Sequence, residues 1–439
     1  MLRYFNAWVL YPLAERYEGR NIRAKTHAVR REMAEPLAAR LVRRRQQIAA
    51  VLARAGGRVP YYRDLFRRHR FAAESVARDL RYLSDLPLLT KDIVREQGER
   101  MLDVDVERTR LHVRKTGGST GPSTHIYYSQ DALDWTAAIN QVAVAGTGRR
   151  MSMKEVHLAS RYPETFPWRS RLKEHAKCMA LNRRNIFTAS FDATELDRVW
   201  QQLERHRPYL VQGHPSTLYA LAMHLRAAGV SGGGVFRVFE STGETLDTRK
   251  RQAIEDVFDC EAFDRYGNAE FGILAYEQTS RNGLQFFDCV GWPETVDCGG
   301  GRQELVVTGL LNDAMPLVRY RTGDLARIEQ REDAIYLCEL AGRVHDLVNI
   351  GSNLYPTHYL QDLLDRLGGI DEFQVEQRSH SRLLLRLVVP NAERQVDIAR
   401  QLHAWWGEKV ELEFTTLDRL TRQGWRGKFR YLVERQAVA

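Results

Sequence analysis

The sequence predicts an α/β protein with a large N-terminal α/β domain and a small α+β domain at the C-terminus. Its 439 residues are enough for more than one domain. After the first quarter of the chain, short apolar strand patterns alternate with helical patterns. Several of these strands end in turns rich in glycine, serine and aspartate. Since ligands of such folds bind where strands end, these turns are the candidate functional segments.

The first 90 residues form a basic helical segment, which we assign to the large domain. The spacing of apolar residues predicts a helix over residues 28–54, with a break or kink at Pro36. A second helix is predicted over residues 76–82.

Residues 91–341 are predicted to form the core of the large domain and to carry most of the candidate functional segments. Strands are expected at residues 109–113, 125–129, 235–240, 262–266 and 304–309. Helices are expected at residues 194–205, 215–228 and 246–258, with Thr194 as the candidate N-cap of the first.

Residues 342–439 are predicted to form a small lid domain, with the boundary near residues 341–346. Its expected elements are a helix at residues 357–367, hairpin strands at residues 372–377 and 382–389, a helix at residues 392–406 and a strand at residues 410–415.

The composition is that of an ordinary globular protein, with 44% hydrophobic and 28% charged residues. The N-terminus has no apolar stretch of the kind found in signal peptides. The longest stretch without a charged side chain, residues 208–225, includes several polar residues, which argues against a membrane span. The cysteines are odd in number, scattered and never in C-x-x-C spacing, so we expect reduced thiols and a cytoplasmic location. They are Cys178, Cys260, Cys289, Cys298 and Cys338.

The net charge of +9 is concentrated in the N-terminal segment. Residues 1–70 contain 17 lysines and arginines against 5 aspartates and glutamates. These cations lie among apolar residues at helical spacing, which favours an amphipathic helix with a solvated face. Peripheral contact with an anionic membrane or another polyanion is the alternative. It is supported by an aromatic cluster of Phe5, Trp8 and Tyr11.

A loop rich in glycine and hydroxyl residues spans residues 115–123, with the sequence Lys-Thr-Gly-Gly-Ser-Thr-Gly-Pro-Ser. Its backbone N–H groups and hydroxyls can surround a phosphate. No lysine follows its last glycine and no helix pattern follows directly, which argues against a Walker-type P-loop. Taken alone, the loop is more typical of a surface β-turn, because glycine and serine are common turn residues.

Two further segments carry residues suited to a nucleotide. Residues 241–246, Ser-Thr-Gly-Glu-Thr-Leu, lie between a strand and a helix and offer backbone amides and the Glu244 carboxylate. A purely structural interpretation is a helix N-cap with Glu244 in the first turn. Residues 266–272 place Tyr266, an aromatic ring that can stack on a base, four residues before Glu270.

Two more segments complete the set. Residues 320–325 are expected to form a tight turn whose Asp324 suits the two hydroxyls of a ribose. Residues 342–346, Gly-Arg-Val-His-Asp, lie at the predicted domain boundary, and Gly427 and Lys428 follow near the C-terminus.

In this order the motifs resemble those of the adenylate-forming superfamily of acyl-activating enzymes. The similarity is to its phenylacetate–coenzyme A ligase and capsule-biosynthesis (CapK-like) branch, over residues 55–433. The resemblance implies a large N-terminal domain and a small mobile C-terminal domain, with the active site between them. It also implies that a carboxylate reacts with ATP to give an acyl-adenylate and pyrophosphate.

The resemblance gives the residues of each motif a role. The loop that would hold the β- and γ-phosphates contains Thr116, Gly117, Gly118, Ser119, Thr120 and Gly121. The adenine-binding residues would be Ser241, Gly243 and Glu244, together with Tyr266, which stacks on the base, and its neighbours Gly267 and Asn268. The remaining roles are Mg²⁺ binding for Glu270, ribose binding for Asp324, nucleotide binding for Arg343 and insertion into the site during adenylation for Lys428.

The acyl pocket is expected near residues 213–216, Gly-His-Pro-Ser, which resemble an element close to the substrate in this family. The candidate pocket residues are His214, Pro215, Ser216, Phe239 and Phe271, with Tyr219 and Asn268 as further candidates. Each of them could equally be packed in the core. Their character favours an aromatic or polar-substituted acid over a long fatty chain.

Some motif positions depart from the family pattern. Ala269 stands where serine or threonine is usual, and His345 stands where aspartate is usual. Some phenylacetate-type relatives carry a Cys/His metal site, but Gln278 and Gln285 stand at two of those positions here. Tetrahedral zinc needs four good ligands, which the remaining cysteines do not supply.

Three functions are compatible with the sequence. The leading hypothesis is an AMP-forming ligase that uses ATP and Mg²⁺ and passes the acyl group of a small acid to coenzyme A. An amide-forming relative would pass the acyl group to an amine instead. A non-catalytic polyanion-binding protein of the same fold is the third, which the joint presence of Glu270, Asp324, Arg343 and Lys428 opposes. We expect no nucleic-acid partner, and the sequence is compatible with a dimer.

Overall fold

A computed structural model describes most of the chain. It covers residues 2–115, 124–160, 168–188, 191–279, 281–299, 301–343, 347–351, 353–356, 360, 364, 367–379, 381–423, 428–429 and 431–433. The chain divides into two compact units. Unit 1 comprises Met1–Lys154, Arg171–Arg183 and Phe263–Leu340, and unit 2 comprises Glu155–Ser170, Arg184–Ala262 and Ala341–Ala439.

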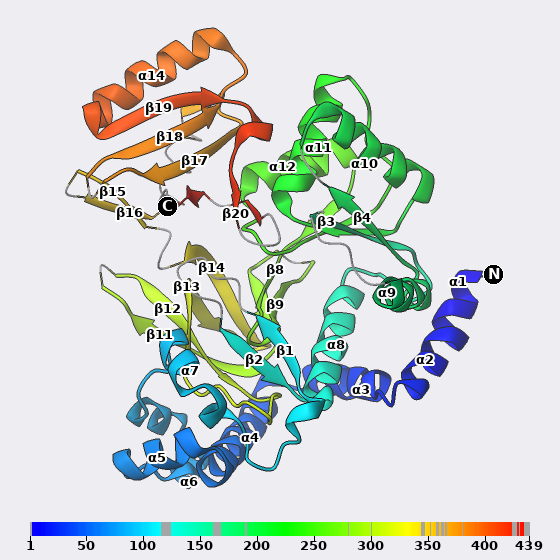
Figure 1. The fold of residues 1–439 in the computed structure, drawn as a ribbon, viewed down its shortest axis with the longest axis vertical. Coiled ribbons are helices and arrows are strands. Elements are labelled where there is room, and N and C mark those ends of the chain that lie inside the picture. Colours follow the sequence, from blue (N-terminus) through cyan, green and yellow to red (C-terminus); the bar gives the residue numbers. More distant parts are fainter. Residues whose placement is uncertain are drawn as a thin grey trace. The chain divides into compact units, whose positions relative to one another are not determined.

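Unit 1 combines N-terminal helices with an antiparallel sheet (Figure 1). Its helices are α1 (Leu2–Phe5), the π-helical turn η1 (Asn6–Leu10), α2 (Tyr11–Tyr17), α3 (Ile22–Met33), α4 (Leu37–Arg58), α5 (Pro60–His69), α6 (Ala73–Arg78), α7 (Lys91–Gln97), α8 (Gln130–Ala145) and, from Arg171 on, α9 (Trp168–Ala180). Its strands are β1 (His112–Lys115), β2 (His125–Tyr128), β8 (Arg265–Asn268), β9 (Gly272–Glu277), β10 (Leu284–Phe286), β11 (Gly291–Asp297), β12 (Gln303–Gly309), β13 (Tyr320–Gln330) and most of β14 (Ile335–Arg343).

The predicted helix over residues 28–54 is interrupted at Pro36, as expected. α3 ends at Met33 and α4 begins at Leu37, and Pro36 between them has an extended backbone with ψ 142°. The ring of a proline cannot donate a helical hydrogen bond, so the helix stops before it. The second predicted helix, residues 76–82, is wrong in its bounds. α6 ends at Arg78, and a 3₁₀ turn over Leu80–Asp85 follows.

The solvated face predicted for the basic helix is only partly correct. Arg40 and Arg44 of α4 are 1% and 0% exposed, and both contact the buried carboxylate of Asp288. A guanidinium group can be buried when a carboxylate and carbonyl oxygens take up its donors. Here Arg40 also donates to the carbonyl oxygens of Glu35, at 2.6 Å, and Asp333, at 3.0 Å.

The main sheet of unit 1 has the strand order β11-β12-β13-β14-β10-β9-β8. The predicted strand at residues 304–309 is confirmed as β12, which pairs with both β11 and β13. The predicted strand at residues 109–113 is displaced, because Arg108–Arg110 forms a 3₁₀ turn and β1 begins at His112. The tight turn expected at Asp324 is wrong. Strand β13 continues through this position without a chain reversal. Its pairing with β12 is irregular here, with a register shift between Glu304 and Val306 and a positive φ of 78° at Gly323.

Unit 2 contains a sheet of order β4-β3-β5-β6-β7 whose strands β3, β5 and β6 are parallel. Its elements are β3 (Glu155–Ser160), β4 (Arg183–Thr188), α10 (Ala193–His206), β5 (Leu210–Gly213), α11 (Pro215–Ala227), β6 (Val238–Ser241), α12 (Thr248–Phe258) and β7 (Glu261–Phe263). Parallel strands alternating with helices confirm the predicted α/β class.

Three details of this part differ from the prediction. The N-cap of α10 is Asp192 rather than Thr194, since the Asp192 carboxylate accepts from the Glu195 backbone N–H at 2.9 Å. The predicted strand at residues 262–266 is two strands, β7 and β8, which belong to different sheets. Helix α12 begins at Thr248 after the cap Asp247, so Glu244 does not lie in its first turn.

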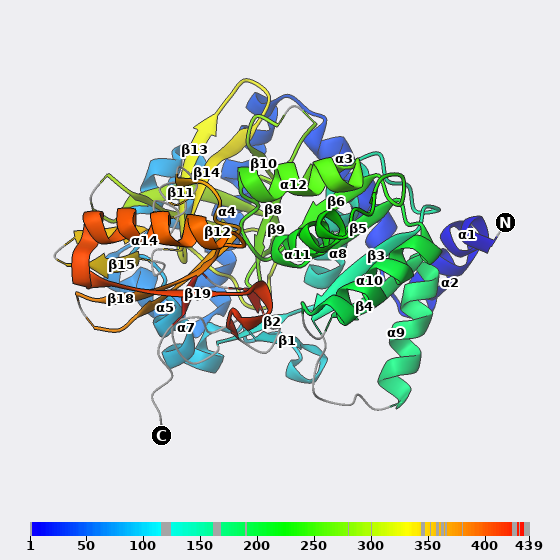
Figure 2. The same ribbon diagram turned by 90° about the horizontal axis from the view of Figure 1, so that it is seen from above.

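The C-terminal part of unit 2 contains a sheet of order β19-β18-β17-β22, and helix α14 (Ala392–Trp406) packs on it (Figures 1 and 2). The predicted hairpin is confirmed as β17 (Glu372–Gln377) and β18 (Leu383–Val388), and the predicted helix and strand are confirmed as α14 (Ala392–Trp406) and β19 (Val410–Thr415). Most of the predicted helix at residues 357–367 lies outside the described residues. The remaining short strands are β15 (Leu347–Ile350), β16 (Asn353–Pro356), β20 (Arg422–Gln423), β21 (Lys428–Phe429) and β22 (Leu432–Val433).

A buried ion pair ties β17 to α12 within unit 2. Lys250 of α12 lies 2.9 Å from the Glu372 carboxylate and donates to the Tyr431 hydroxyl at 2.6 Å. Burial alone would lower the pKa of Lys250, but the neighbouring acidic groups, Glu372 foremost, raise it well above its ordinary value. Lys250 therefore stays charged at neutral pH.

In the part of the chain that the structure describes, no helix has the length and apolar character needed to cross a membrane.

Candidate active site

Tyr266 and Asp324, the predicted adenine and ribose residues, contact each other in unit 1. Tyr266 lies in β8, the edge strand of the main sheet, and Asp324 lies in β13. The Tyr266 hydroxyl donates to the Asp324 carboxylate at 2.7 Å. The two strands are separated in the sheet by β14, β10 and β9, so the sheet must curl for this bond to form. Burial, followed by the charge of Asp324, raises the pKa of Tyr266 well above its ordinary value, which keeps the hydroxyl protonated as a donor.

Glu270 lies in the turn after β8 and is hydrogen-bonded by Tyr320, which lies in β13 four residues before Asp324. The Tyr320 hydroxyl donates to Glu270 Oε1 at 2.8 Å, and Glu270 is 9% exposed. The Tyr128 hydroxyl lies 2.7 and 2.5 Å from the carbonyl oxygens of Ala269 and Glu270. The backbone and the carboxylate of Glu270 are therefore both oriented by tyrosines, neither of which the sequence assigned a role.

Gly267 and Asn268 shape this turn. A Cβ atom on Gly267 would lie 2.4 Å from the carbonyl oxygen of Gly272, so only glycine allows the two strands to approach this closely. The Asn268 side chain accepts from the Phe271 backbone N–H at 3.0 Å, which closes the turn around Glu270. The structure thus explains both residues through backbone geometry.

Glu304 of β12 holds the neighbouring segment of β13 that carries Asp324, and the sequence assigned Glu304 no role. Its carboxylate accepts from Arg321 Nε at 2.9 Å and from the Gly323 backbone N–H at 3.0 Å. It is only 1% exposed. The signal that could have found it is a lone acid in an otherwise apolar strand, because such a group is rarely buried without partners.

A small pocket, partly open to solvent, lies beside Glu270 in unit 1. Its lining includes the predicted pocket residue Phe271 together with Tyr128, Thr136, Asn312 and Met315. The Asn312 amide donates to the Tyr127 carbonyl at 2.8 Å. Its buried Oδ1 has no hydrogen-bond partner within the described ranges. A buried acceptor of this kind is costly unless something donates to it.

The second group of predicted residues comes together in unit 2, at the carboxyl ends of β5 and β6. The backbone N–H and hydroxyl of Ser216 donate to the Glu244 carboxylate at 3.1 and 3.0 Å. His214 Nδ1 lies 3.2 Å from Glu244 Oε1. Gly213 and Ser241 are register partners in the parallel pair, which explains why the segments that follow them meet.

The surroundings of Glu244 lower its pKa. Burial would raise it, but the hydrogen bond and charge of His214, the charge of Lys250 and the Ser216 hydroxyl lower it to about 2. Glu244 is therefore ionised throughout the physiological range, as an anionic acceptor at the N-terminus of α11, which carries Ser216.

This pKa predicts a pH-dependent contribution to stability. Because the folded-state pKa is about 2 against an ordinary value of 4.5, the ionised carboxylate stabilises the fold above that value and the effect is lost as the pH falls toward 2. The difference corresponds to about 3 kcal/mol at neutral pH. We expect Glu244→Gln to lower the free energy of unfolding at neutral pH and to converge on the wild type in acid. Denaturant unfolding at both pH values measures this, and a constant difference would contradict it.

The other residues predicted near the acyl group have different surroundings. Phe239 is 0% exposed and belongs to the core around β5, β6 and their helices. It is therefore a core residue, which was the alternative to a place in the acyl pocket. Tyr219 is 2% exposed, and its hydroxyl donates to the Asp371 carbonyl at 3.1 Å. Pro215 opens α11 and is buried. The Ser241 hydroxyl is buried and finds no hydrogen-bond partner among the described residues.

Several predicted site residues cannot be placed with the others. The loop residues Thr116, Gly117, Gly118, Ser119, Thr120 and Gly121 lie outside the described residues, as does His345. Arg343 ends β14 and Lys428 begins β21, opposite Gln423. The structure therefore joins Tyr266, Glu270 and Asp324 in unit 1 and His214, Ser216 and Glu244 in unit 2.

Among the described residues, no group of three or more histidines, cysteines, aspartates or glutamates is arranged to hold a metal ion. Cys289 is buried, which raises the pKa of its thiol, and Cys298 donates to the Arg302 carbonyl at 3.2 Å.

Comparison with known proteins finds distant relatives that match most of the chain. No protein-family model matches the chain. Protein CapK of Staphylococcus aureus is 22% identical over 364 residues, 81% of this chain and 78% of that protein. Phenylacetate-coenzyme A ligase of Thermus thermophilus is 24% identical over 382 residues, 83% of each chain.

The solved structures agree on the fold. 2-Hydroxyisobutyryl-CoA ligase in the postadenylation state, in complex with R3-HIB-AMP, matches with a TM-score of 0.73 at 18% identity over 92% of both chains. The same ligase in complex with 2-HIB-AMP and CoA matches with a TM-score of 0.60 at 20% identity, over 92% of this chain and 91% of that one.

The fold is that of the adenylate-forming enzymes, which confirms the predicted fold class. The sequence relatives confirm the resemblance to the phenylacetate–coenzyme A ligase and CapK branch. They likewise support the predicted class of enzyme, an AMP-forming ligase.

Proposed function

We propose that the chain activates a small carboxylic acid with ATP and then transfers the acyl group to coenzyme A. In the first step a carboxylate oxygen attacks the α-phosphorus of ATP, and pyrophosphate leaves with the electrons of the α–β bond. In the second step the thiol of coenzyme A attacks the acyl carbon, and AMP leaves. The observation that carries the proposal is the set Tyr266, Glu270 and Asp324, held together beside a pocket in one unit.

The nucleotide end of the site would use Asp324 and Tyr266. The Asp324 carboxylate can accept hydrogen bonds from the two ribose hydroxyls while it also accepts from Tyr266. That bond fixes the direction of the Tyr266 ring, which suits stacking on adenine. Glu304 holds the strand that carries Asp324, so the acceptor is positioned before the nucleotide binds.

Glu270 fits the predicted Mg²⁺ site by its chemistry. Mg²⁺ is bound in nucleotide sites by one or two carboxylates together with phosphate oxygens and water. Tyr320 holds one oxygen of Glu270, which orients the carboxylate. When bound, Mg²⁺ would neutralise charge on the phosphates.

The phosphate end would use the loop residues Thr116 to Gly121 and the cation Lys428. A triphosphate repels an incoming carboxylate, so catalysis of this step depends on positioning and charge neutralisation. Lys428 supplies a compact positive charge on the predicted lid, residues 342–439, and Arg343 at its start supplies another.

The pocket beside Glu270 supports a small acid with a hydroxyl or amino substituent. Phe271 and Met315 offer apolar contact, and Thr136 and Asn312 in the same lining are polar side chains that suit a hydroxyl or amino substituent. A site that hydrogen-bonds such a substituent rejects analogues that lack it, because the polar group of the site is then left unpaired.

Transfer to an amine is the second candidate, since the adenylation machinery would be the same and no residue described so far selects the acceptor. Use of ATP and coenzyme A supports the predicted cytoplasmic location. The polyanion-binding alternative requires a nucleotide site without activity, which the ordered Tyr266, Glu270 and Asp324 group opposes.

The test is acid-dependent release of pyrophosphate from ATP in the presence of Mg²⁺. We expect release with hydroxy- or amino-substituted acids and much less with matched acids that lack the substituent. Addition of coenzyme A or of amines to the same reactions then identifies the acceptor. Binding of ATP without release for any acid would reject the ligase proposal and favour a non-catalytic protein.

A further inference from the structure

The N-terminal helices of unit 1 expose a continuous set of apolar and aromatic side chains. Their exposed fractions range from 39% at Val9 to 93% at Tyr17, and Trp8 is 74% exposed. We call this set the N-terminal aromatic face. It consists of Tyr4, Phe5, Trp8, Val9, Leu13 and Tyr17. Exposed apolar patches of this kind mark a binding surface more often than a chance arrangement.

The π-helical turn η1 keeps these residues on one side. A π-helix turns less per residue than an α-helix, so Trp8 and Val9 stay on the side of Tyr4 and Leu13. The opposite side is buried and holds Asn6, Ala7, Tyr11 and Glu15. The predicted aromatic cluster is corrected accordingly, because Tyr11 points inward and its hydroxyl accepts from Gln141 at 2.7 Å. Phe5 and Trp8 remain exposed.

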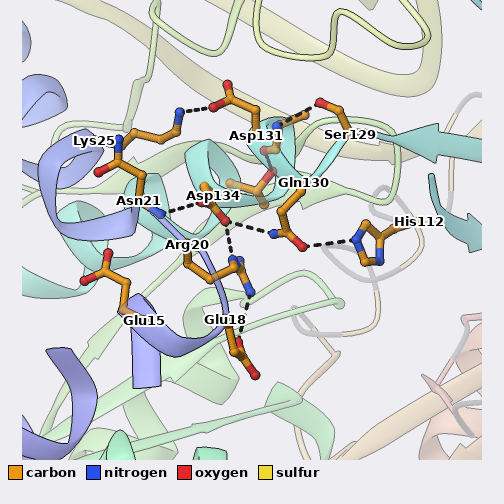
Figure 3. A network of polar contacts seen from close by, with 12 residues as sticks. Glu15, Glu18, Arg20, Asn21, Lys25, His112, Ser129, Gln130, Asp131 and Asp134 are labelled. Carbon is orange, nitrogen blue, oxygen red and sulfur yellow. Dashed lines mark hydrogen bonds and ion pairs between the residues drawn. The ribbon is translucent and has the colours of Figure 1, made fainter. Parts of the chain in front are cut away.

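The N-terminal aromatic face is anchored to the rest of unit 1. Figure 3 shows Asp134 of α8 accepting from the Asn21 backbone N–H, at 2.7 Å, and from the Arg20 side chain just after α2. Lys25 of α3 pairs with Asp131 one turn before Asp134. The segment that follows the face is thus fixed to α8 through the buried Asp134 carboxylate. The helices that carry the face are therefore an ordered part of unit 1 rather than a frayed chain end.

Helix α9 lies beside these helices and also exposes apolar side chains. Asn182, just after α9, donates to the Arg3 carbonyl at 2.9 Å, and its side-chain oxygen accepts from Asn6 at 3.0 Å. Lys173 lies 3.8 Å from Glu18. Figures 1 and 2 both show α9 next to α2. α9 exposes Leu172 and Met179, at 61% and 47%.

The charge around these apolar residues is positive. Residues 2–23 contain four arginines against two glutamates, and α9 contains four lysines and arginines against one glutamate. Arg3, Arg16 and Arg171 are exposed and make no ion pair with any other described residue. The surface therefore combines tryptophan, tyrosine and aliphatic side chains with unpaired cations.

We propose that the N-terminal aromatic face and α9 dock on the surface of an anionic phospholipid bilayer. Tryptophan and tyrosine prefer the headgroup region, aliphatic groups reach the acyl boundary and arginines attract anionic headgroups. A second copy of the chain fits the surface less well, since a symmetric contact would bring like charges together. The inference does not depend on the proposed catalytic function.

The test is flotation of the full-length chain with vesicles of phosphatidylcholine alone and of phosphatidylcholine with about one third phosphatidylglycerol. We expect binding to the anionic vesicles, weakened by salt, and little binding to the neutral ones. Trp8→Ser combined with Phe5→Ser should lower binding about tenfold or more by removing apolar contact. Arg3→Glu combined with Arg16→Glu should lower it to a similar extent by reversing charge.

The matched control is Trp405→Ser on α14, which replaces an exposed tryptophan elsewhere on the chain, 48% exposed, and should bind as the wild type. Unchanged thermal unfolding of every variant shows that folding is intact. Absence of binding to anionic vesicles, or equal binding to both kinds, would overturn the proposal. So would a dimer that Trp8→Ser converts to monomer, or RNA binding that the same arginine variants abolish in the absence of lipid binding.

Discussion

Replacing Lys428 with alanine is expected to slow acid-dependent pyrophosphate release by about 10²- to 10³-fold, or roughly 3–4 kcal/mol in transition-state free energy. The proposed function gives this lysine the role of neutralising charge that develops while the carboxylate attacks the α-phosphorus. An interaction made only in the transition state changes kcat and kcat/KM together. We therefore expect kcat to fall with little change in the affinity for ATP, measured by steady-state kinetics and by equilibrium binding of ATP.

The second half-reaction separates a catalytic loss from a structural one. If the lid presents Lys428 only for adenylation, the variant should still convert a supplied acyl-adenylate and coenzyme A to the thioester at close to the wild-type rate. Lys409→Ala is the control, because Lys409 is an exposed lysine of the same C-terminal region. Equal losses in both half-reactions would indicate damage to the lid, and an unchanged rate of adenylation would remove Lys428 from the proposed site.

Local signals in the sequence predicted much of the fold. Pro36 lacks a backbone N–H, so its effect on the helix does not depend on tertiary contacts. The hairpin of β17 and β18 follows from apolar residues on both sides of a polar turn. The N-cap of α10 was misplaced by two residues because Asp192 and Thr194 are both good caps and only the backbone geometry decides between them.

Tertiary contacts explain what the sequence did not predict. Family motifs brought Tyr266 and Asp324 into one site, but the bond between them arises from the curl of the sheet. Glu304 belongs to no motif and acts by holding the strand beside it. Phe239 follows the pattern of a pocket residue and of a core residue equally well, and only its complete burial shows that it is core.

The same limit applies to charge. The helical pattern of α4 predicts a solvated arginine face, since arginine is rarely buried without a partner. The partner of Arg40 and Arg44 is Asp288, more than two hundred residues later in the chain. No local pattern connects the helix with that carboxylate, so burial of the two arginines could not be predicted from the segment itself.

Replacing Asp288 with alanine is expected to lower the free energy of unfolding by about 3–5 kcal/mol. The Asp288 carboxylate accepts from Arg40 Nε at 3.0 Å and Arg44 Nε at 2.8 Å, and none of the three residues is more than 1% exposed. Alanine would leave two buried guanidinium groups without their shared acceptor, and desolvated charge of this kind is costly. Denaturant unfolding at fixed pH and ionic strength measures the effect.

Removing all three charges together distinguishes this cause from a simple packing defect. With Asp288→Leu, Arg40→Met and Arg44→Met in one chain, the three fully buried charges are gone, and Glu32, the other partner of Arg44, keeps its ion pair with Arg43 at 3.4 Å. We therefore expect much of the lost stability to return. A packing defect would instead leave the triple variant at least as unstable as Asp288→Ala. The control is Asp85→Ala, an exposed aspartate at the end of a 3₁₀ turn, which should change stability little. If Asp288→Ala loses no more stability than this control, the prediction is contradicted. The buried arginines would then be satisfied by other acceptors, and the ion pair with Asp288 would not be needed for stability.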